Sequence, residues 1–365
     1  MPHGASSNHA DAPRRTLLTG GAGFIGSHLA ERLLARGDRL TVVDDLSTGR
    51  RENLPEHPRL TFIHADLGAT LRAFEQTHGH RPDGAERFDE IYHLAAAVGV
   101  GLVMDDPARA IEINVGQTAE LFRYAARQTE RTREPVPVLI ASSSEVYGKP
   151  DRERFSEDDD VIYGPTTVAR WSYAAAKALD EHLALAHHDA GRVSAVVARL
   201  FNTVGPRQLG AYGMVLPRFV QAALRDEPLR VFGDGTQSRC FCDVRDVADA
   251  LPRLLAEPAA RGRVFNLGRD EPITIRELAE LVIEELGSRS AIELVPYDRA
   301  YPPGFEDLHR RRPDLSRIVS AIGFRPARTL RETVRDLAEQ MGGRAPSPPK
   351  TEPAPNQGTA ELRRS

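Results

Sequence analysis

The chain contains little cysteine: Cys240 and Cys242 are the only two in 365 residues, and a single residue separates them. Two cysteines at this spacing suit neither a disulfide framework nor the four-ligand set of a structural metal site. We therefore expect no bound metal, and we predict that the two cysteines are strand residues that alternate around Phe241.

Long apolar runs are absent as well. No stretch approaches the roughly 18 consecutive apolar residues that suggest a membrane-spanning helix. The polar start MPHGASSNHADAPRR also lacks the hydrophobic region of a signal peptide. These two absences predict a cytoplasmic protein that has no membrane partner.

Neither sign of charge is in large excess, because the formal net charge is −4 and the arginines are scattered along the chain. A general nucleic-acid binder needs a basic surface that neutralises phosphates. We therefore expect no nucleic-acid partner, whereas a small anionic ligand remains compatible with this charge.

Apolar residues are plentiful: they make up 41% of the chain, which is enough to bury a large core. Short apolar runs typical of buried strands alternate with longer helical patterns. This alternation predicts an α/β fold, a Rossmann-like doubly wound parallel sheet with helices on both faces. The predicted strands are TLLTG, LTVVD, LTFIHAD, EIYHLAA, VPVLIAS and VSAVVARLFN.

The pattern changes at Phe201, after which loops rich in Gly and Pro separate short helices. These segments predict a smaller, loop-rich C-terminal lobe over the carboxyl ends of the strands, where open sheets bind ligands. Both chain ends are rich in Pro, Ser, Gly and charge, so we expect them not to pack. The predicted organisation is a disordered N-terminus (1–13), a Rossmann domain (14–200) with a return segment (about 243–268), a substrate-binding lobe (201–242 and 269–341) and a disordered tail (342–365).

The segment TLLTGGAGFIGSHLAERLLARG has the pattern of a strand, a glycine turn and an amphipathic helix. Gly20, Gly23 and Gly26 can serve a tight turn, a close approach of the backbone to a pyrophosphate, and close packing of helix on strand. The N–H groups at the start of the helix, around Phe24 and Ile25, would face the phosphates. The alternative is a surface turn without a ligand, but the strand and helix on either side favour a dinucleotide cradle.

Asp44 ends the next predicted strand, LTVVD, where a carboxylate can accept the ribose hydroxyls of an adenine dinucleotide. Asp45 beside it would repel a 2′-phosphate, so we predict NAD rather than NADP as the cofactor. Asp66, after the third strand, is predicted to lie near the adenine, although it can equally be a simple cap at the strand end. Leu67 and Leu94 complete the predicted cofactor-binding set.

Tyr173 and Lys177 lie four residues apart in the helical pattern WSYAAAKALDEHLALAHH, and therefore on one face of the helix. A tyrosine is too weak a base near neutral pH unless its anion is stabilised. A neighbouring ammonium and the positive nicotinamide ring of oxidised NAD both provide that stabilisation. This spacing therefore predicts a catalytic base downstream of the dinucleotide cradle, rather than an ordinary helix face.

Taken together, TGGAGFIGS, ASSSEVYG, YAAAK, RLFNTVGPR and GDGTQSRCFCDVRDVADAL resemble the extended short-chain dehydrogenase/reductase family. Within that family they resemble the nucleotide-sugar epimerases, dehydratases and decarboxylases. The resemblance covers nearly all of the chain between the two tails. It implies a UDP-sugar substrate, a transient 4-keto sugar and a homodimer built through a four-helix interface.

The resemblance also implies roles for single residues. Ser143 would hydrogen-bond the sugar 4-hydroxyl, Tyr173 would remove its proton, and Lys177 would bind the nicotinamide ribose and lower the pKa of the tyrosine. Asn202 and Arg239 would contact the diphosphate, a task suited to a guanidinium. The resemblance also implies that Val231 and Phe232 flank the nucleotide base of the substrate. Both can equally be plain core residues of a strand.

Ser144 and Glu145 distinguish the branches of the family. The family's 4,6-dehydratases carry Asp and Glu after the catalytic Thr, and typical 4-epimerases carry a small or neutral residue at the position of Glu145. The UDP-glucuronate decarboxylases carry Ser-Glu-Val-Tyr-Gly, as found from Ser144 to Gly148. Alignment with their Arg-Lys-Pro segment selects Arg311, whereas Arg310 and Arg312 fit a solvated basic face.

The reaction implied most directly is the decarboxylation of UDP-glucuronate to UDP-xylose. Oxidation at C4 turns the C6 carboxylate into part of a β-keto acid, so the main task of the protein is orientation and control of charge. The alternatives are a UDP-glucose or other UDP-hexose 4-epimerase, and then a nucleotide-sugar 4,6-dehydratase. A protein of another class, a non-catalytic NAD-binding scaffold, would not need the set of Ser143, Tyr173 and Lys177.

Overall fold

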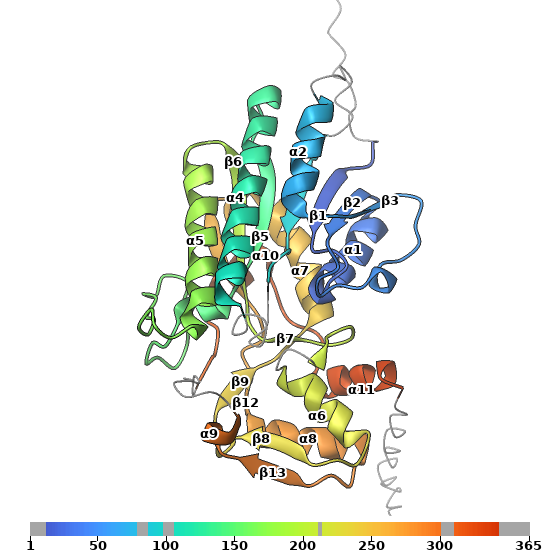
Figure 1. Ribbon diagram of the computed structural model, residues 1–365, viewed down its shortest axis with the longest axis vertical. Coiled ribbons are helices and arrows are strands. Elements are labelled where there is room, and N and C mark those ends of the chain that lie inside the picture. Colours follow the sequence, from blue (N-terminus) through green and yellow to red (C-terminus); the bar gives the residue numbers. More distant parts are fainter. Residues whose placement is uncertain (1–11, 79–86, 98–105, 211–213, 301–309, 343–365) are drawn as a thin grey trace, which may run out of the picture.

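The computed structural model describes residues 12–78, 87–97, 106–210, 214–300 and 310–342. Its centre is a seven-stranded parallel sheet with the strand order β11-β6-β5-β4-β1-β2-β3 (Figure 1). The strands of this sheet are β1 (Arg15–Thr19), β2 (Arg39–Asp44), β3 (Leu60–His64), β4 (Glu90–His93), β5 (Val136–Ser143), β6 (Val193–Leu200) and β11 (Arg263–Leu267).

The apolar runs form strands because the sheet buries both of their faces. In β6, for example, seven of the eight residues are buried. All six strands predicted from the sequence are present, and β11 adds a seventh by pairing with β6. The Rossmann-like α/β prediction is therefore confirmed.

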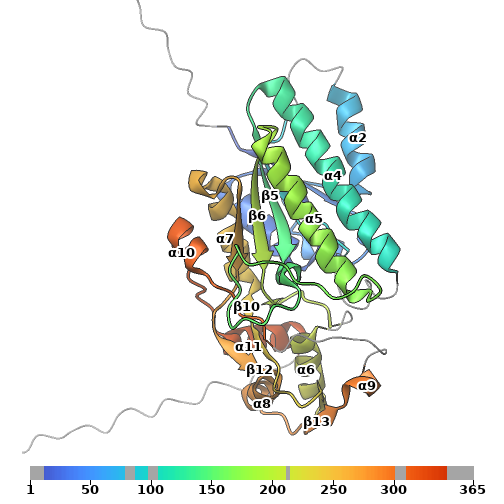
Figure 2. The same cartoon turned by 90° about the vertical axis from the view of Figure 1, so that its left-hand side faces the viewer.

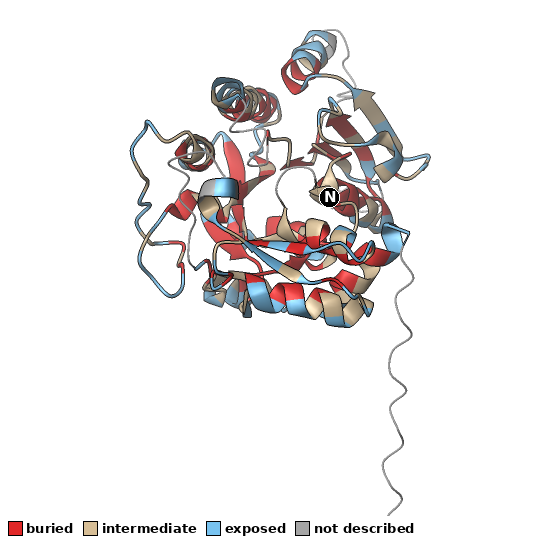
Figure 3. Ribbon diagram, turned by 60° about the horizontal axis from the view of Figure 1, so that its bottom comes forward, coloured by how far each residue is buried: buried red, intermediate tan, exposed pale blue. Residues whose placement is uncertain are grey.

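Helices cover both faces of the sheet (Figures 1 and 2). One core lies under α1, α7 and α10 and includes Leu33, Leu251 and Ile318. The other lies under α2, α4 and α5 and includes Leu71, Phe122 and Ala184. Figure 3 shows the resulting pattern, with buried residues along the strands and exposed residues on the outer faces of the helices. The covering helices are α1 (Phe24–Arg36), α2 (Leu67–His78), α4 (Pro107–Thr132), α5 (Arg170–Asp189), α7 (Val244–Ala256) and α10 (Ser316–Ile322).

A smaller lobe lies at the carboxyl ends of the strands, and the arrowhead of β5 points toward it in Figure 2. It has its own core, which includes Leu216, Phe241 and Val334. Capping boxes at Thr274 and Thr329 fix the starts of α8 and α11. Its elements are β7 (Thr203–Val204), α6 (Val215–Ala223), β8 (Leu229–Phe232), β9 (Ser238–Cys240), β10 (Cys242–Asp243), β12 (Pro272–Thr274), α8 (Ile275–Leu286), β13 (Ile292–Val295), α9 (Tyr297–Ala300) and α11 (Leu330–Gln340). Outside the lobe, the described residues form short turns of 3-10 helix at η1 (Arg51–Asn53), η2 (Ser144–Tyr147) and η4 (Pro258–Ala260).

After the first part of the lobe, the chain returns to the sheet before it forms the second part. This return supports the predicted domain boundaries, which stay a prediction. Helix α7 packs on α1, and β11 pairs with β6, so the segment between the two parts of the lobe belongs to the sheet. The predicted disordered ends lie almost entirely outside the described residues. No helix in the described part of the chain is long and apolar enough to cross a membrane.

The two cysteines alternate around Phe241, as predicted: β9 ends at Cys240 and β10 begins at Cys242. Both are buried and unbonded to each other, and burial raises the pKa of Cys240 to about 12. Among the described residues no group of His, Cys, Asp and Glu could hold a metal ion.

Candidate functional site

The glycine turn between β1 and α1 leaves no room for a side chain at Gly20 or Gly26. A Cβ on Gly20, whose φ is +69°, would lie 2.6 Å from the backbone nitrogen of Ala95, and one on Gly26 would lie 2.1 Å from the Gly20 carbonyl oxygen. Helix α1 begins with Gly23 as its N-cap, without a side-chain cap and without an acidic residue in its first turn. The N–H groups of Phe24 and Ile25 are therefore available to an anion, which is what a pyrophosphate requires.

We expect Gly26→Ala to weaken NAD binding and to lower the free energy of unfolding by about 1–3 kcal/mol, because the added methyl group forces the turn apart. Equilibrium unfolding and NAD titration measure the two effects. Gly116→Ala is the matched control, since a Cβ there meets nothing within 4 Å. Equal NAD affinity in the Gly26 variant and the control would contradict the assignment of the cradle.

Asp44 lies at the end of β2, against this turn. Its carboxylate accepts hydrogen bonds from the backbone N–H groups of Ala22 and Leu46, both at 2.9 Å. Burial raises the pKa of Asp44, although these two hydrogen bonds oppose that effect. The carboxylate is thus held in place beside the cradle, where the predicted ribose contact requires it.

Asp66 caps a helix in this structure. Its side chain accepts a hydrogen bond from the backbone N–H of Ala69 at 2.8 Å, in the first turn of α2. The alternative interpretation of Asp66 as a cap therefore describes its observed contact, and its contact with adenine stays a prediction. Leu67 is the buried first residue of α2, and Leu94, directly after β4, packs against the core under α1.

Ser143 and Tyr173 come together from two elements. Ser143 is the last residue of β5, and its hydroxyl accepts the N–H of Glu145 at 3.2 Å. Tyr173 lies in the first turn of α5 and packs against Ala97 and Ala110. Burial first, and then the charge of Glu145, raise the pKa of Tyr173, whereas a hydrogen bond with the Ser143 hydroxyl lowers it.

Lys177 forms a buried ion pair one turn further along α5 from Tyr173. Its ammonium lies 2.9 Å from the Asp180 carboxylate, and both side chains are buried. The prediction that Lys177 lowers the pKa of Tyr173 stays a prediction, and the observed contact of its ammonium is the ion pair with Asp180. The positive nicotinamide ring, which oxidised NAD would supply when bound, would also favour the phenolate, in addition to the Ser143 hydroxyl.

Glu145 is held between two guanidinium groups. Arg311 lies 2.7 Å from one of its carboxylate oxygens, and Arg170 lies 3.6 Å from the other. Burial alone would raise the pKa of Glu145, but the charges of Arg311 and Arg170 outweigh it, so the pKa is lowered. Glu145 is therefore ionised near neutral pH beside Tyr173, whereas Ser144 before it is buried.

The backbone fixes which arginine of the RRR run points inward. Phe155 and the segment around Pro313 form a β-bridge, in which the Phe155 N–H donates to the Arg312 carbonyl at 2.8 Å. Arg311 is only 7% exposed, so it does not belong to a solvated basic face. Arg310 is exposed, and Arg312 pairs with Glu153 at 3.1 Å on the outside.

Sequence reasoning missed two charged residues of this site, Arg170 and Asp180. Arg170 is three residues before Tyr173, and Asp180 is three residues after Lys177, so all four share one face of α5. That spacing was a usable signal. Their partners, however, come from η2, β4 and α4, and only the folded chain brings those elements together.

The predicted substrate contacts meet at the edge of the lobe. Asn202 follows β6 with φ +34°, and its side-chain amide donates to the Cys240 carbonyl at 3.0 Å, next to Arg239. The charge of Arg239 adds a smaller contribution to the lowered pKa of Glu145, after those of Arg311 and Arg170. Val231 is fully buried in the lobe core, as expected for the alternative of a plain core residue, whereas Phe232 is partly exposed, and the contact of both with the nucleotide base stays a prediction.

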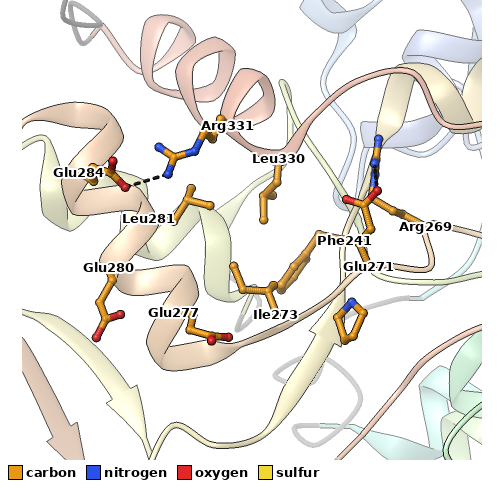
Figure 4. A pocket seen from close by; sticks show the side chains of 11 residues that line it. Phe241, Arg269, Glu271, Ile273, Glu277, Glu280, Leu281, Glu284, Leu330 and Arg331 are labelled. Carbon is orange, nitrogen blue, oxygen red and sulfur yellow. Dashed lines mark hydrogen bonds and ion pairs between the residues drawn. The ribbon is translucent and has the colours of Figure 1, made fainter. Parts of the chain in front are cut away.

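The partly exposed ring of Phe232 is covered by the guanidinium of Arg218, 4.6 Å from the ring centroid. A separate hollow of about 530 Å³ lies on the lobe between β12, α8 and α11 (Figure 4). It contains none of the predicted site residues. Its two arginines are paired, Arg331 with Glu284 at 2.8 Å and Arg269 with Glu271 at 2.7 Å, so we assign no ligand to it.

The arrangement can remove a proton from an alcohol and control a nearby anion. The phenol of Tyr173 meets the Ser143 hydroxyl, and the Glu145 carboxylate with its two guanidiniums acts on the phenol. These groups support the transfer of a hydride from a substrate alcohol to a nicotinamide. They also support the stabilisation or destabilisation of an anion at the neighbouring carbon of the substrate.

Comparison with known proteins also indicates an enzyme that uses a nicotinamide cofactor. Residues 16–268 match the NAD dependent epimerase/dehydratase family. The chain is 37% identical over 331 residues to a UDP-N-acetyl-alpha-D-glucosaminuronate decarboxylase of Bacillus cytotoxicus, covering 89% of this chain and 98% of that protein. It is 34% identical over 336 residues to UDP-glucuronic acid decarboxylase 4 of Arabidopsis thaliana, covering 90% of this chain and 70% of that protein.

Solved structures share the fold. A UDP-glucose 4-epimerase of Thermus thermophilus in complex with NAD has a TM-score of 0.74 at 30% identity, covering 90% of this chain and 99% of that one. A dTDP-glucose 4,6-dehydratase of Streptomyces venezuelae with NAD bound has a TM-score of 0.76 at 29% identity, covering 90% and 98%. With its glycine cradle and its Tyr173 and Lys177 pair, the chain belongs to the NAD dependent epimerase/dehydratase family, and NAD is its cofactor.

Proposed function

We propose that this protein decarboxylates a UDP-uronate through a transient 4-keto sugar, with UDP-glucuronate as the substrate and UDP-xylose as the product. The observation that carries the proposal is the position of Glu145, which lies between Arg311 and Arg170 and next to the Tyr173 base. A 4-epimerase only has to let its keto sugar rotate, so it has no need of this charged group.

Each residue has a role in the proposed reaction. Tyr173 removes the proton of the sugar 4-hydroxyl, which Ser143 holds by a hydrogen bond, and NAD, when bound, accepts and returns the C4 hydride. Lys177 holds the nicotinamide ribose. Asn202 and Arg239 hold the diphosphate at the edge of the lobe, consistent with the ability of a guanidinium to bind two oxygens at once.

Charge control completes the reaction. Two guanidiniums and one carboxylate leave a net positive charge that can receive the carboxylate of the sugar. Carbon dioxide leaves without charge, so a purely cationic pocket would bind the substrate more tightly than the transition state and slow the reaction. Glu145 reduces that ground-state binding, and a water held near Arg311 then gives a proton to C5 of the enolate.

A second candidate substrate is UDP-N-acetylglucosaminuronate. The relative in Bacillus cytotoxicus is named for that substrate, and the match covers 98% of its length. Both candidates carry the carboxylate on C6 and the hydroxyl on C4, so the proposed roles of Tyr173 and Glu145 are the same for each. They differ only at C2.

A substrate panel tests the proposal. We expect the NAD-loaded protein to release carbon dioxide from UDP-glucuronate, and mass spectrometry and NMR then identify UDP-xylose. Release from the N-acetyl sugar with a higher kcat/KM would transfer the assignment to the second candidate. Conversion of UDP-glucose to its C4 epimer, without release of carbon dioxide from either uronate, would establish the epimerase instead.

We also propose a homodimer through α4 and α5. The two helices pack side by side on one face of the sheet, and Ile111 on α4 and Leu179 on α5 are apolar side chains that are 39% and 53% exposed. Analytical ultracentrifugation should give a dimer, and Leu179→Glu should give a monomer. A wild-type monomer at micromolar concentration would refute this.

The cytoplasmic location stays a prediction.

A further inference from the structure

A chain of buried polar side chains connects the start of the glycine turn to Lys177. The Thr19 hydroxyl lies 2.7 Å from Nδ1 of His93, whose Nε2 lies 3.1 Å from the Thr118 hydroxyl. Thr118 in turn hydrogen-bonds Asp180, and Asp180 pairs with Lys177 at 2.9 Å. The five residues come from β1, β4, α4 and α5, and none is more than 3% exposed.

The donors of this chain run toward Asp180. Burial, and then the charge of Lys177, lower the pKa of His93 to about 3, so its imidazole is neutral and has one donor and one acceptor. The Thr19 hydroxyl accepts the Ala95 N–H at 3.2 Å, which leaves its own proton for Nδ1 of His93. The Nε2–H then donates to Thr118, whose single hydroxyl proton is shared between the Asn114 carbonyl, at 2.8 Å, and the Asp180 carboxylate.

Asp180 also lies on the same face of α5 as the two residues of the proposed base. Tyr173, Lys177 and Asp180 are spaced by four and three residues, which is the spacing of one helix face. The carboxylate gives the buried ammonium of Lys177 a counter-charge. It also balances the positive charge that Lys177 would otherwise exert on the phenol of Tyr173.

We propose that Asp180 is a positioning residue, which anchors the Lys177 ammonium and sets how much of its positive charge reaches Tyr173. Thr118 and His93 hold Asp180 in that place. The inference rests on Tyr173 as the base of the proposed function, but not on the identity of the sugar.

The charged and titratable groups around Tyr173 and Asp180 come from η2, α5 and β4. Burial is the main cause that raises the pKa of Tyr173 and of Asp180. The charges of Glu145 from η2 and Asp180 from α5 also raise the pKa of Tyr173, and the charge of Glu181 also raises that of Asp180. His93 from β4 is neutral. Removal of the Asp180 charge should therefore leave Lys177 as the stronger influence on the phenol.

The test is a titration of Tyr173 in the NAD-loaded protein by ultraviolet difference spectroscopy, with Tyr173→Phe as the reference. It needs no substrate, so its result is independent of the reaction catalysed. In Asp180→Asn we expect Tyr173 to ionise about one pH unit lower than in the wild type, because a negative charge near the phenolate is lost. Asp180→Glu should restore the wild-type titration.

Two further variants exclude a general structural effect. Thr118→Val keeps the Lys177–Asp180 pair but removes the hydrogen bond to Asp180, so we expect a smaller shift in the same direction. Asp189→Asn removes an exposed carboxylate at the far end of α5 and should leave the titration unchanged. If Asp180→Asn does not fold, the Thr118 variant decides, and an unchanged or raised phenol pKa in the folded variant would overturn the proposal.

The pH dependence of turnover gives a second readout. Activity rises with pH as Tyr173 loses its proton, so the acidic limb of kcat/KM should move to lower pH in Asp180→Asn together with the spectroscopic titration. If no sugar is turned over by any variant, the proposed function fails while the titration still tests Asp180. A lower rate with both profiles unmoved would reduce Asp180 to a structural role.

Discussion

Tyr173→Phe should lower the turnover of UDP-glucuronate by about 10³-fold, because it removes the group that takes the proton from the sugar 4-hydroxyl. NAD binding should be unchanged, since the cradle from Gly20 to Gly26 lies on a different element. Steady-state kinetics with saturating NAD measure the first effect, and NAD titration measures the second.

Tyr163→Phe is the matched control for this change. The Tyr163 hydroxyl donates to the Ala174 carbonyl at 3.3 Å, so the variant removes a tyrosine hydroxyl that contacts the same helix but does not face Ser143. We expect its rate to stay within about twofold of the wild type, as is usual for the loss of one weak hydrogen bond. Equal rates in both variants would remove Tyr173 from the mechanism.

Glu145→Gln should lower kcat by about 10²-fold and should also lower KM, a pair of changes that indicates tighter binding of the ground state. The variant leaves Arg311 and Arg170 without their carboxylate, so they hold the carboxylate of the sugar more strongly and oppose its loss as neutral carbon dioxide. Rates of carbon dioxide release over a range of UDP-glucuronate concentrations separate the two constants.

Glu153→Gln is the control for the loss of a glutamate near the same arginine run. Glu153 pairs with Arg312 at 3.1 Å, but its side chain is 75% exposed, and exposed ion pairs contribute little. Its kinetic constants should therefore match those of the wild type. A Glu145 variant with a raised KM and an unchanged kcat would show that Glu145 only binds the substrate.

Much of the fold could be predicted because burial on both faces of a parallel sheet leaves a continuous apolar run in the sequence. The runs ending at Thr19, Asp44 and Leu200 are examples, and each forms the strand expected. The glycine turn was equally readable, since a Cβ at Gly20 or at Gly26 would collide with backbone atoms. These signals are local, so one sequence is enough to find them.

The parts of the site that the sequence did not give depend on contacts between distant segments. Lys177 was found from its spacing to Tyr173, but its partner Asp180 becomes important only when β4 and α4 bury the pair. Arg170 is one of many arginines until η2 places Glu145 beside it. Val231 fits a pocket contact as well as a core residue in sequence, and only the lobe core decides between them.

The most direct test of the central claim uses UDP-glucuronate that carries deuterium at C4 and carbon-13 in the carboxylate. If the protein borrows a hydride from C4 and returns it after the carboxylate has left, labelled carbon dioxide and UDP-xylose that retains its C4 deuterium should form together in equal amounts. Labelled carbon dioxide with loss of the C4 deuterium to solvent, or no labelled carbon dioxide at all, would contradict the mechanism.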